Sequence, residues 1–430
     1  MLQVISIEAS DMEYLSMAEW VSDEDAAYAH NLVAKICTEA GPGVPGSNAE
    51  RARANIVQDA MAQIVDEVAE EEFTMHPRAF LGWFTLGVFL ALISLLFYYL
   101  SDLPFGQIVF ISIAFGIATF ILLMLIFEFL LYREFVDFLF PKATSENVVG
   151  RILPESGEEP TRLIIFSGHH DSAWQFTWLR YLKHGYYISE AVLIFGVLSL
   201  FLGCTVKLVS ILANLPYPPW IAAYLVIVSW VLLPAGFVFG VFFTERGASG
   251  TVPGATDNLS GTTCALAMGR IVKNHPEIVP ANTEIRIVSF GSEEAGCRGS
   301  TRYVARHLAE LRAKDAVIIN FETIAQPEIS ILTSDSNGFV HNSKEIVDHV
   351  AAAAEASGTP HIVHPFFFGG GGTDSLPFSR AGIKSACLFG MKVPGQMLQF
   401  YHQDRDTPDK LNDEALKNAL KIATEYLRSL

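Results

Sequence analysis

Basic residues are scarce in this 430-residue sequence, and their scarcity limits what the protein can bind. Lysine and arginine together number 29 against 46 aspartates and glutamates, so the formal net charge at pH 7 is −17. A nucleic-acid-binding surface needs clustered positive charge to meet the phosphates, and the sequence contains no such cluster. We therefore expect no nucleic-acid partner.

Cysteine is scarce as well. The five cysteines are scattered through the chain without a CxxC pair, so the sequence does not predict a disulfide framework. The first twenty residues, MLQVISIEASDMEYLSMAEW, lack the basic stretch and apolar core of a secretory signal peptide. We expect buried, reduced cysteines in a reducing compartment.

Charged residues of either sign make up only 17% of the chain, whereas hydrophobic residues make up 51% and mean hydropathy is +0.33. A bilayer-spanning helix needs about 20 apolar residues, and four segments are long enough: 80–100, 108–131, 187–211 and 219–243. Short turn-prone links, SDLPFGQ and ANLPYPP, join the first pair and the second pair. The sequence therefore predicts two transmembrane helical hairpins, 79–131 and 187–243, with four spans.

The remaining polar chain, 1–78, 132–186 and 244–430, alternates expected helices and strands. Helices are expected near 24–40, 48–69, 258–273, 299–313, 343–357 and 412–430. Strands are expected at EEFTMHP, NVVGRILPE, TRLIIFSGHHD, 283–291, 315–322, 328–333, 360–364 and 383–389. This alternation indicates an α/β fold, in which a mixed, mainly parallel central sheet carries helices on both faces. We expect one discontinuous domain into which the two hairpins are inserted.

Polar side chains follow several of the expected strands. His169 and Asp171 follow one strand, the adjacent Glu293 and Glu294 follow another, and Glu322 ends a third. Asp257 lies in GATDNLSG after the second hairpin, and His402 lies in YHQDRDTPDKL. Strand carboxyl ends are where open α/β sheets place their sites, and imidazole with carboxylate is a zinc ligand set. The pattern therefore favours a hydrolytic zinc site.

These stretches resemble a known family, the zinc exopeptidases that include bacterial leucyl aminopeptidases, glutamate carboxypeptidase and glutaminyl cyclase. The resemblance rests on GPGVPGSNAERARA, SENVVGRI, SGHHDS, GATDNLSG, SEEAGCRGS, NFETI, TDSLPF and YHQDRDTPDKL, in that order. The apolar hairpins lie outside it. The resemblance implies a zinc aminopeptidase-like fold.

The resemblance also implies a role for each site residue. His169, Asp257 and Glu322 would hold one zinc ion, and Asp257, Glu294 and His402 a second, with Asp257 bridging the two. Glu293 would be the general base that takes a proton from the bridging water, and Asp171 would orient His169. Tyr401 matches a tyrosine that helps to stabilise the oxyanion in some relatives. Asp374 and Asp406 match positions that orient ligands.

The sequence departs from the family at three points. Glu322 stands where many relatives have aspartate, TDSLPF lacks the histidine that often follows its aspartate, and two spans separate Asp171 from Asp257. None of these differences removes an implied ligand. Since successive side chains of a strand point to opposite faces, His169 and Asp171 should share one side, which leaves His170 as a structural neighbour.

The sequence thus predicts a membrane-bound dizinc aminopeptidase that hydrolyses short or membrane-proximal peptides by a metal-bridging hydroxide. A carboxypeptidase or a glutaminyl-cyclase-like enzyme is the alternative within the enzyme class, with Arg298 and Arg302 as candidates to grip a substrate carboxylate. A non-catalytic receptor or scaffold on the same fold is the third interpretation, and loss of ligands would mark it.

The chain segments that flank the hairpins predict the orientation in the membrane. Arginine and lysine gather on the catalytic side, whereas the hairpin tips offer Asp102 and Lys207, so the positive-inside rule predicts a cytoplasmic catalytic domain. If EEFTMHP, NVVGRI and LIIFSGHHD run as an up-down-up meander, both hairpins leave from the sheet edge that carries His169. We therefore expect an active site that faces the membrane surface.

Overall fold

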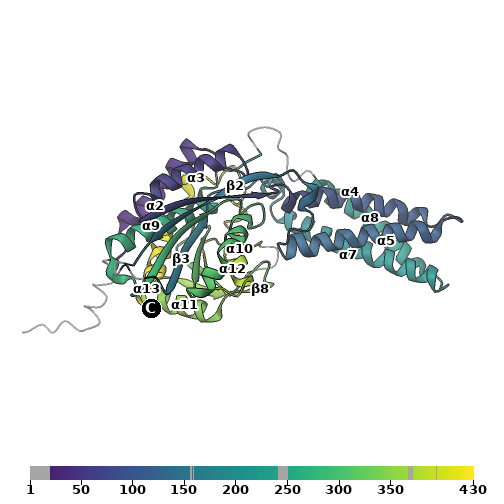
Figure 1. Cartoon of the computed structure of the whole chain (residues 1–430). Helices are drawn as coiled ribbons and strands as arrows, with labels where there is room; N and C mark the ends of the chain where they lie inside the picture. The colour runs from purple at the N-terminus through teal and green to yellow at the C-terminus, as the bar shows by residue number, and fades with distance from the viewer. Residues whose placement is uncertain (1–19, 155–156, 158, 241–249, 367–370, 394) are drawn as a thin grey trace, which may run out of the picture. The chain divides into compact units, whose positions relative to one another are not determined.

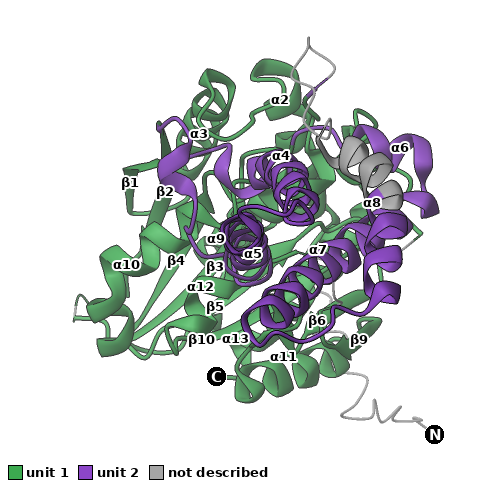
Figure 2. Cartoon of the chain, turned by 90° about the vertical axis from the view of Figure 1, so that its right-hand side faces the viewer, with its two compact units in different colours: residues 1–75, 143–173, 251–430 green, residues 76–142, 174–250 purple. Residues whose placement is uncertain are grey.

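The computed structural model of the chain describes residues 20–430 except 155–156, 158, 241–249, 367–370 and 394. The chain divides into two compact units (Figure 2). Unit 1 is Met1–Met75, Ala143–Ala173 and Thr251–Leu430, and unit 2 is His76–Lys142 and Trp174–Gly250. The domain bounds expected from the sequence stay a prediction. The expectation of no signal peptide falls largely on residues 1–19, outside the described residues.

Unit 1 is built on an eight-stranded sheet of order β1-β2-β4-β3-β5-β10-β6-β9 (Figure 1). The parallel neighbours are β4 with β3, β3 with β5, β5 with β10, and β6 with β9, while the other adjacent pairs are antiparallel. The sheet strands are β1 (Glu67–Met75), β2 (Ala143–Ile152), β3 (Arg162–His169), β4 (Thr283–Phe290), β5 (Val317–Glu322), β6 (Ile329–Leu332), β9 (His361–His364) and β10 (Lys384–Phe389). A separate pair joins β7 (Ser334–Asp335) to β8 (Val340–His341). The predicted mixed, mainly parallel α/β fold is confirmed.

Helices cover both faces of this sheet, because alternate strand residues are buried on opposite sides. Ile164 and Phe166 belong to one core cluster and Leu163 and Ile165 to another, as expected for strands buried on both faces. The helices of the first cluster are α2 (Asp23–Glu39), α3 (Asn48–Met61), α9 (Ser260–Asn274), α11 (Lys344–Ala356) and α13 (Asp413–Arg428). Those of the second are α10 (Arg298–Ala313) and α12 (Ser375–Arg380). Short helical turns are η3 (Ala255–Leu259), η4 (Pro276–Ile278) and η5 (Pro408–Lys410).

Two local expectations are wrong. The helix expected over 48–69 ends at Met61, and the chain turns into β1 at Glu67, where it pairs in register with Arg151 of β2. The strands β1, β2 and β3 form no simple meander, since β4 lies between β2 and β3. In both cases long-range strand pairing, which a local pattern cannot report, decides the outcome.

Both insertions still leave unit 1 at one edge of its sheet. Since β1 and β4 are each antiparallel to β2, and β4 is parallel to β3, β1 ends at the edge where β3 ends with His169. Met75 is paired with Ala143 across the first insertion. The Val252 N–H donates to the Ala173 carbonyl (3.3 Å) across the second. The chain therefore departs and returns beside the carboxyl ends of the parallel strands.

Unit 2 is built mainly from apolar helices. They are α4 (Ala79–Leu100), α5 (Gln107–Met124) with η1 (Leu125–Leu130), η2 (Asp137–Leu139), α6 (Thr177–Leu182), α7 (His184–Leu212) and α8 (Pro219–Gly240). By length and composition three helices could cross a membrane: Ala79–Leu100, Gln107–Leu130 and His184–Leu212. In the described part of α8 the apolar helix is the shorter Pro219–Ser229, so the fourth expected span stays a prediction.

The two hairpins of unit 2 are joined through Lys207 of α7. Its side chain is 4% exposed, and its ammonium donates to Asp102 Oδ1 (2.7 Å) and to the Tyr98 carbonyl (2.9 Å). The same ammonium lies 4.1 Å from the centre of the Tyr98 ring. The Tyr98 hydroxyl in turn bonds that of Tyr217 (2.6 Å). Lys207 is therefore an internal ion-pair partner rather than a free positive charge at a hairpin tip.

Candidate metal centre

Side chains of the ligand type gather at the carboxyl edge of the parallel strands in unit 1. His169 is the last residue of β3 and Glu322 the last of β5, and Glu293 and Glu294 directly follow β4. Asp257 lies in η3, immediately before α9. A Cβ at Gly168 would lie 2.3 Å from the Thr262 nitrogen, so glycine is what lets the start of α9 pack this closely on β3.

The geometry brings five of these residues into two groups. His169, Asp257 and Glu322 form one, and Asp257, Glu294 and His402 form the other; in each, one candidate ligand atom per residue lies within 4.8 Å of the others. Asp257 is shared, with Oδ1 3.6 Å from His169 Nε2 and Oδ2 3.0 Å from His402 Nε2. These are the two ligand sets that the resemblance implies, and metal binding by them stays a prediction.

Asp171 connects the first group to the loop that carries the two glutamates. Its Oδ1 lies 3.3 Å from His169 Nδ1, on the side of the ring opposite Nε2. The same carboxylate accepts the backbone N–H groups of Glu293 and Glu294, each at 3.0 Å. One buried carboxylate therefore positions an imidazole, the candidate base and a candidate ligand together.

Glu293 lies between this loop and the first group. Its Oε2 is 3.7 Å from His169 Nε2, and its Oε1 accepts from the Cys297 thiol (3.2 Å). Glu293 is therefore beside the candidate ligands without belonging to either group, the place a proton-transfer group needs.

Two further side chains hold the segment around Asp257. Asp406 accepts from the Thr256 N–H (2.8 Å), the Thr256 hydroxyl (2.5 Å) and the Asp257 N–H (3.1 Å). Asn258 donates to Glu322 Oε2 (3.1 Å). Asp406 thus orients the backbone that carries the candidate ligand Asp257, and Asn258, which the sequence reasoning missed, contacts the candidate ligand carboxylate of Glu322.

Helix α3 supplies two buried charges that the sequence reasoning also missed. Glu50 is 1% exposed and accepts from the Ser292 N–H (2.7 Å), next to Glu293. Arg53 is fully buried and donates to the carbonyls of Gly41, His170 and Pro253. Arg53 therefore joins the segment before the second insertion to the segment after it. The stretch GPGVPGSNAERARA carries part of the family resemblance, but no role is predicted from it for Glu50 or Arg53.

The remaining candidates occupy different positions. His170 is buried against the Ser289 hydroxyl (2.9 Å), and burial lowers its pKa to about 4, consistent with a structural role. The Tyr401 ring stacks on His402 at 3.8 Å between centroids. Asp374 is fully buried at the start of α12. Arg298 is only 1% exposed, with a guanidinium nitrogen 3.5 Å from the Gly296 carbonyl, and Arg302 is half-buried.

The electrostatics of this cluster fit a site for cations. Burial, reinforced by Asp257, raises the pKa of Glu294 to about 7. Burial likewise raises the pKa of Glu293 well above its usual range, with Asp374 adding to the effect. Burial opposes protonation of His402, yet Glu294 and Asp257 raise its pKa to about 10. Buried carboxylates thus outnumber the imidazoles. Two of their oxygens, Asp257 Oδ2 and Glu294 Oε1, accept no hydrogen bond of good geometry within the described residues, although His402 Nε2 lies 3.0 Å from the first and 3.2 Å from the second. Divalent cations would neutralise this excess and use both oxygens.

The comparisons with known proteins agree with this geometry. Residues 243–427 match Peptidase family M28. The chain is 33% identical over 181 residues to aminopeptidase YwaD of Bacillus subtilis (strain 168), a match that covers 40% of this chain and 36% of the relative. The match therefore spans just over a third of that relative's length.

Solved structures extend the likeness to the whole fold. BSAP, a zinc aminopeptidase from Bacillus subtilis, superposes with a TM-score of 0.53 at 16% identity and covers 94% of this chain and 95% of its own. A glutaminyl cyclase from an Acidobacteriales bacterium gives 0.52 at 13% identity, with 94% of each chain covered. At these identities the likeness concerns the fold. The family resemblance predicted from the sequence is confirmed.

Proposed function

We propose that this chain, whose residues 243–427 match Peptidase family M28, is a membrane-attached zinc exopeptidase that removes N-terminal residues from peptides. The observation that carries the proposal is the pair of buried ligand groups that share Asp257, with Glu293 beside them. A retired peptidase fold would not need to keep both groups and the adjacent base.

The two groups support a site for two zinc ions. His169 Nε2 lies 3.6 Å from Asp257 Oδ1 and His402 Nε2 lies 3.0 Å from Asp257 Oδ2, while Glu322 belongs to the first group and Glu294 to the second. Zinc ions held by these two groups would supply Lewis acidity, which polarises a scissile carbonyl and lowers the pKa of a bound water.

Glu293 would move the proton. Its carboxylate would accept a proton from the attacking water and deliver it to the nitrogen of the departing peptide. Burial raises the pKa of Glu293 above that of an ordinary carboxyl group, and a carboxylate that both accepts and delivers a proton works best with a pKa nearer the working pH. Asp171 would hold the backbone of Glu293 in place, and the Cys297 thiol would hold its carboxylate.

The aminopeptidase interpretation is favoured over a carboxypeptidase. A carboxypeptidase needs a cation that faces the substrate carboxylate. Arg298, one of the two candidates, is almost completely buried at the start of α10, next to the Gly296 carbonyl. The relative that is 33% identical over 181 residues is named an aminopeptidase. The Tyr401 ring stacks on His402 of the second group, and its hydroxyl would help to stabilise the oxyanion.

Membrane attachment rests on the apolar helices of unit 2. In unit 1, both insertions depart from the sheet edge that carries the candidate ligands. This supports an active site near the membrane surface, and the basic residues that flank the helices support a cytoplasmic catalytic unit.

The test is hydrolysis of an aminoacyl-anilide panel by the detergent-solubilised, zinc-loaded chain and its Glu293→Gln variant. Glu24→Gln, an exposed glutamate of α2, is the matched control. The proposal predicts that Glu293→Gln loses at least about a hundredfold in kcat, whereas Glu24→Gln does not change. Undiminished turnover by Glu293→Gln would reject the base. Cyclisation of N-terminal glutamine without anilide hydrolysis would favour the cyclase instead.

A further inference from the structure

A pocket in unit 2 has no part in the proposed catalysis. It has a volume of about 570 Å³ and lies beside the first turns of α4, where Leu139 and Phe140 of the segment after η1 and Trp174 also line it. This volume falls in the range of about 300–1,000 Å³ that ligand pockets occupy.

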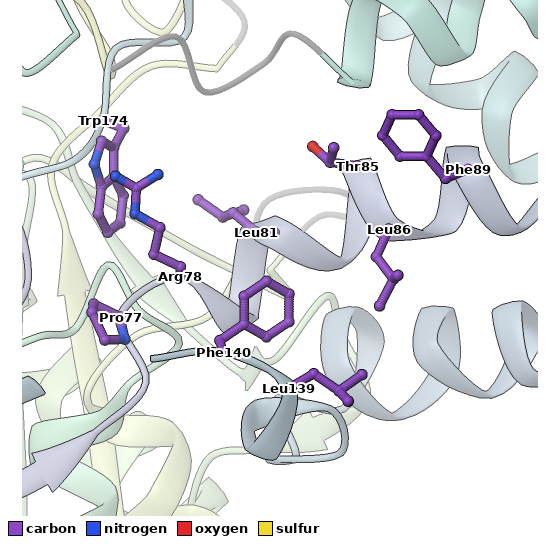
Figure 3. A pocket seen from close by; sticks show the side chains of 10 residues that line it. Pro77, Arg78, Leu81, Thr85, Leu86, Phe89, Leu139, Phe140 and Trp174 are labelled. Atoms are coloured by element: carbon purple, nitrogen blue, oxygen red, sulfur yellow. The ribbon is translucent and has the colours of Figure 1, made fainter. Parts of the chain in front are cut away.

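One end of the pocket is cationic and aromatic. Figure 3 shows the Arg78 side chain beside the Trp174 indole, and the guanidinium carbon lies 5.7 Å from the centre of that ring. Arg78 directly precedes α4, which could cross a membrane. Arginine and tryptophan are the residues that typically mark the level of the lipid headgroups.

The rest of the pocket is apolar and follows one face of α4. Leu81, Leu86 and Phe89 line it together with Phe140 (Figure 3). From Arg78 to Phe89 the helix rises roughly 16 Å, at 1.5 Å per residue. Phe89, at the far end, is 61% exposed. The pocket is thus cationic at Arg78 and apolar along α4 toward Phe89. This is the direction in which α4 would enter the hydrocarbon core of a bilayer.

We propose that this pocket binds one anionic phospholipid, with its phosphate at Arg78 and one acyl chain along the α4 stripe. The polarity of the pocket matches that of the lipid from end to end. A planar guanidinium can donate two parallel hydrogen bonds to a phosphate. The apolar side chains along α4 can contact an acyl chain along most of the stripe. The proposal rests on the membrane attachment proposed above, and it adds lipid headgroup selectivity to it.

The test uses the full-length chain in nanodiscs of phosphatidylcholine that contain increasing fractions of phosphatidylglycerol. Brominated acyl chains quench nearby tryptophan, and a Trp174→Phe preparation supplies the background from the other five tryptophans. The proposal predicts that brominated phosphatidylglycerol quenches Trp174 at a lower mole fraction than brominated phosphatidylcholine does. Equal quenching by the two lipids overturns it, and this comparison needs no pocket variant.

Two pocket variants and one control make the test specific. Arg78→Gln should raise the half-quenching fraction of phosphatidylglycerol about fivefold, the factor expected for one basic side chain at an anionic surface. Thr85→Phe should block the acyl chain, since Thr85 lines the pocket. Arg133→Gln removes an equal charge from an exposed position outside the pocket lining and should leave the quenching unchanged. An Arg133→Gln loss as large as that of Arg78→Gln, or full quenching of Thr85→Phe, overturns the proposal.

Two measurements on the same samples separate this proposal from the proposed function. Incorporation into nanodiscs reports membrane attachment, and anilide hydrolysis reports the peptidase site. A chain that enters nanodiscs and hydrolyses substrate but shows no preference for phosphatidylglycerol refutes the lipid site alone. A chain that does not enter nanodiscs refutes the membrane attachment on which the site depends.

Discussion

Substitution of Glu50 tests how the loop that carries Ser292 and the proposed base Glu293 is held in its conformation. Its Oε1 accepts from the Ser292 N–H (2.7 Å), the Ser292 hydroxyl (2.8 Å) and the Ser145 hydroxyl (2.9 Å), and its Oε2 accepts from the Gly46 N–H (2.5 Å). Ser292 has a φ of 54°, a left-handed conformation that non-glycine residues rarely adopt. Glu50 thus stabilises a strained turn immediately before Glu293.

The expected magnitude follows from the donors that Glu50 satisfies. The two hydroxyls can rotate toward other acceptors, but the N–H groups of Ser292 and Gly46 cannot. Each buried donor left without an acceptor costs about 1–3 kcal/mol, so Glu50→Ala should lower the free energy of unfolding by roughly 2–6 kcal/mol. Glu50→Gln keeps one carbonyl oxygen with two lone pairs, which can still accept from Ser292. Its cost should be about 1–3 kcal/mol, for the Gly46 N–H alone.

Activity should separate the two variants further. A turn that relaxes by about 1 Å can cost a hundredfold in rate when it carries a catalytic group. We therefore expect kcat of Glu50→Ala to fall about 10- to 100-fold at a temperature where the variant is folded, with little change in KM. Glu50→Gln should retain most of wild-type kcat despite its lower stability.

The assay combines thermal unfolding in detergent with steady-state anilide hydrolysis, and Glu24→Ala serves as the exposed control. Wild-type kcat in folded Glu50→Ala would refute the positioning role of Glu50. An equal loss of kcat in Glu50→Gln and Glu50→Ala would show that the charge of Glu50, rather than the turn it holds, supports activity.

Three further changes test other parts of the structure. Asp406→Asn places an amide against the backbone donors of the Asp257 segment, so zinc affinity should fall about 10- to 100-fold in a chelator competition; unchanged affinity would contradict this role. Burial opposes ionisation of Glu284, yet neighbouring arginines hold its pKa at about 2. Its folded-state pKa is depressed, so its stabilisation is present above pH 4.5 and lost as the pH falls to about 2, and Glu284→Gln should flatten urea-unfolding stability across that window. Lys207→Met combined with Asp102→Asn should reveal a coupling of about 0.5–1 kcal/mol in detergent unfolding, because Asp102 is largely exposed; zero coupling would show that the Lys207–Asp102 ion pair does not stabilise unit 2.

Much of the fold could be predicted from local sequence. Apolar runs such as LIIF and IRIV mark strands buried on both faces, and polar residues directly after them mark the sheet edge. Alternation alone placed His169 and Asp171 on the same side, and the structure brings Asp171 Oδ1 within 3.3 Å of His169 Nδ1. These features depend on residues close in the chain, which is why the sequence reports them.

What local sequence could not report depends on distant segments. The position of β4 between β2 and β3 requires pairing across the second insertion. Local sequence does not report the buried contacts of Glu50 with Ser145 and of Arg53 with His170, because each joins residues more than 90 positions apart in the chain. Removing the Arg53 guanidinium from water costs free energy, and hydrogen bonds to three carbonyls from separate loops offset that cost. The features that local sequence does not predict are thus the contacts between distant segments of unit 1 that position the candidate site.

Zinc bound per chain, measured by elemental analysis of metal-depleted and reloaded protein, tests the central claim most directly. The structure predicts two zinc ions for the wild type, two for Glu293→Gln, and one for His402→Ala, since His402 belongs to only one of the two groups that share Asp257. A wild type that retains a single ion, or a Glu293→Gln variant that loses zinc, would contradict a dizinc centre in which Glu293 transfers protons without binding metal.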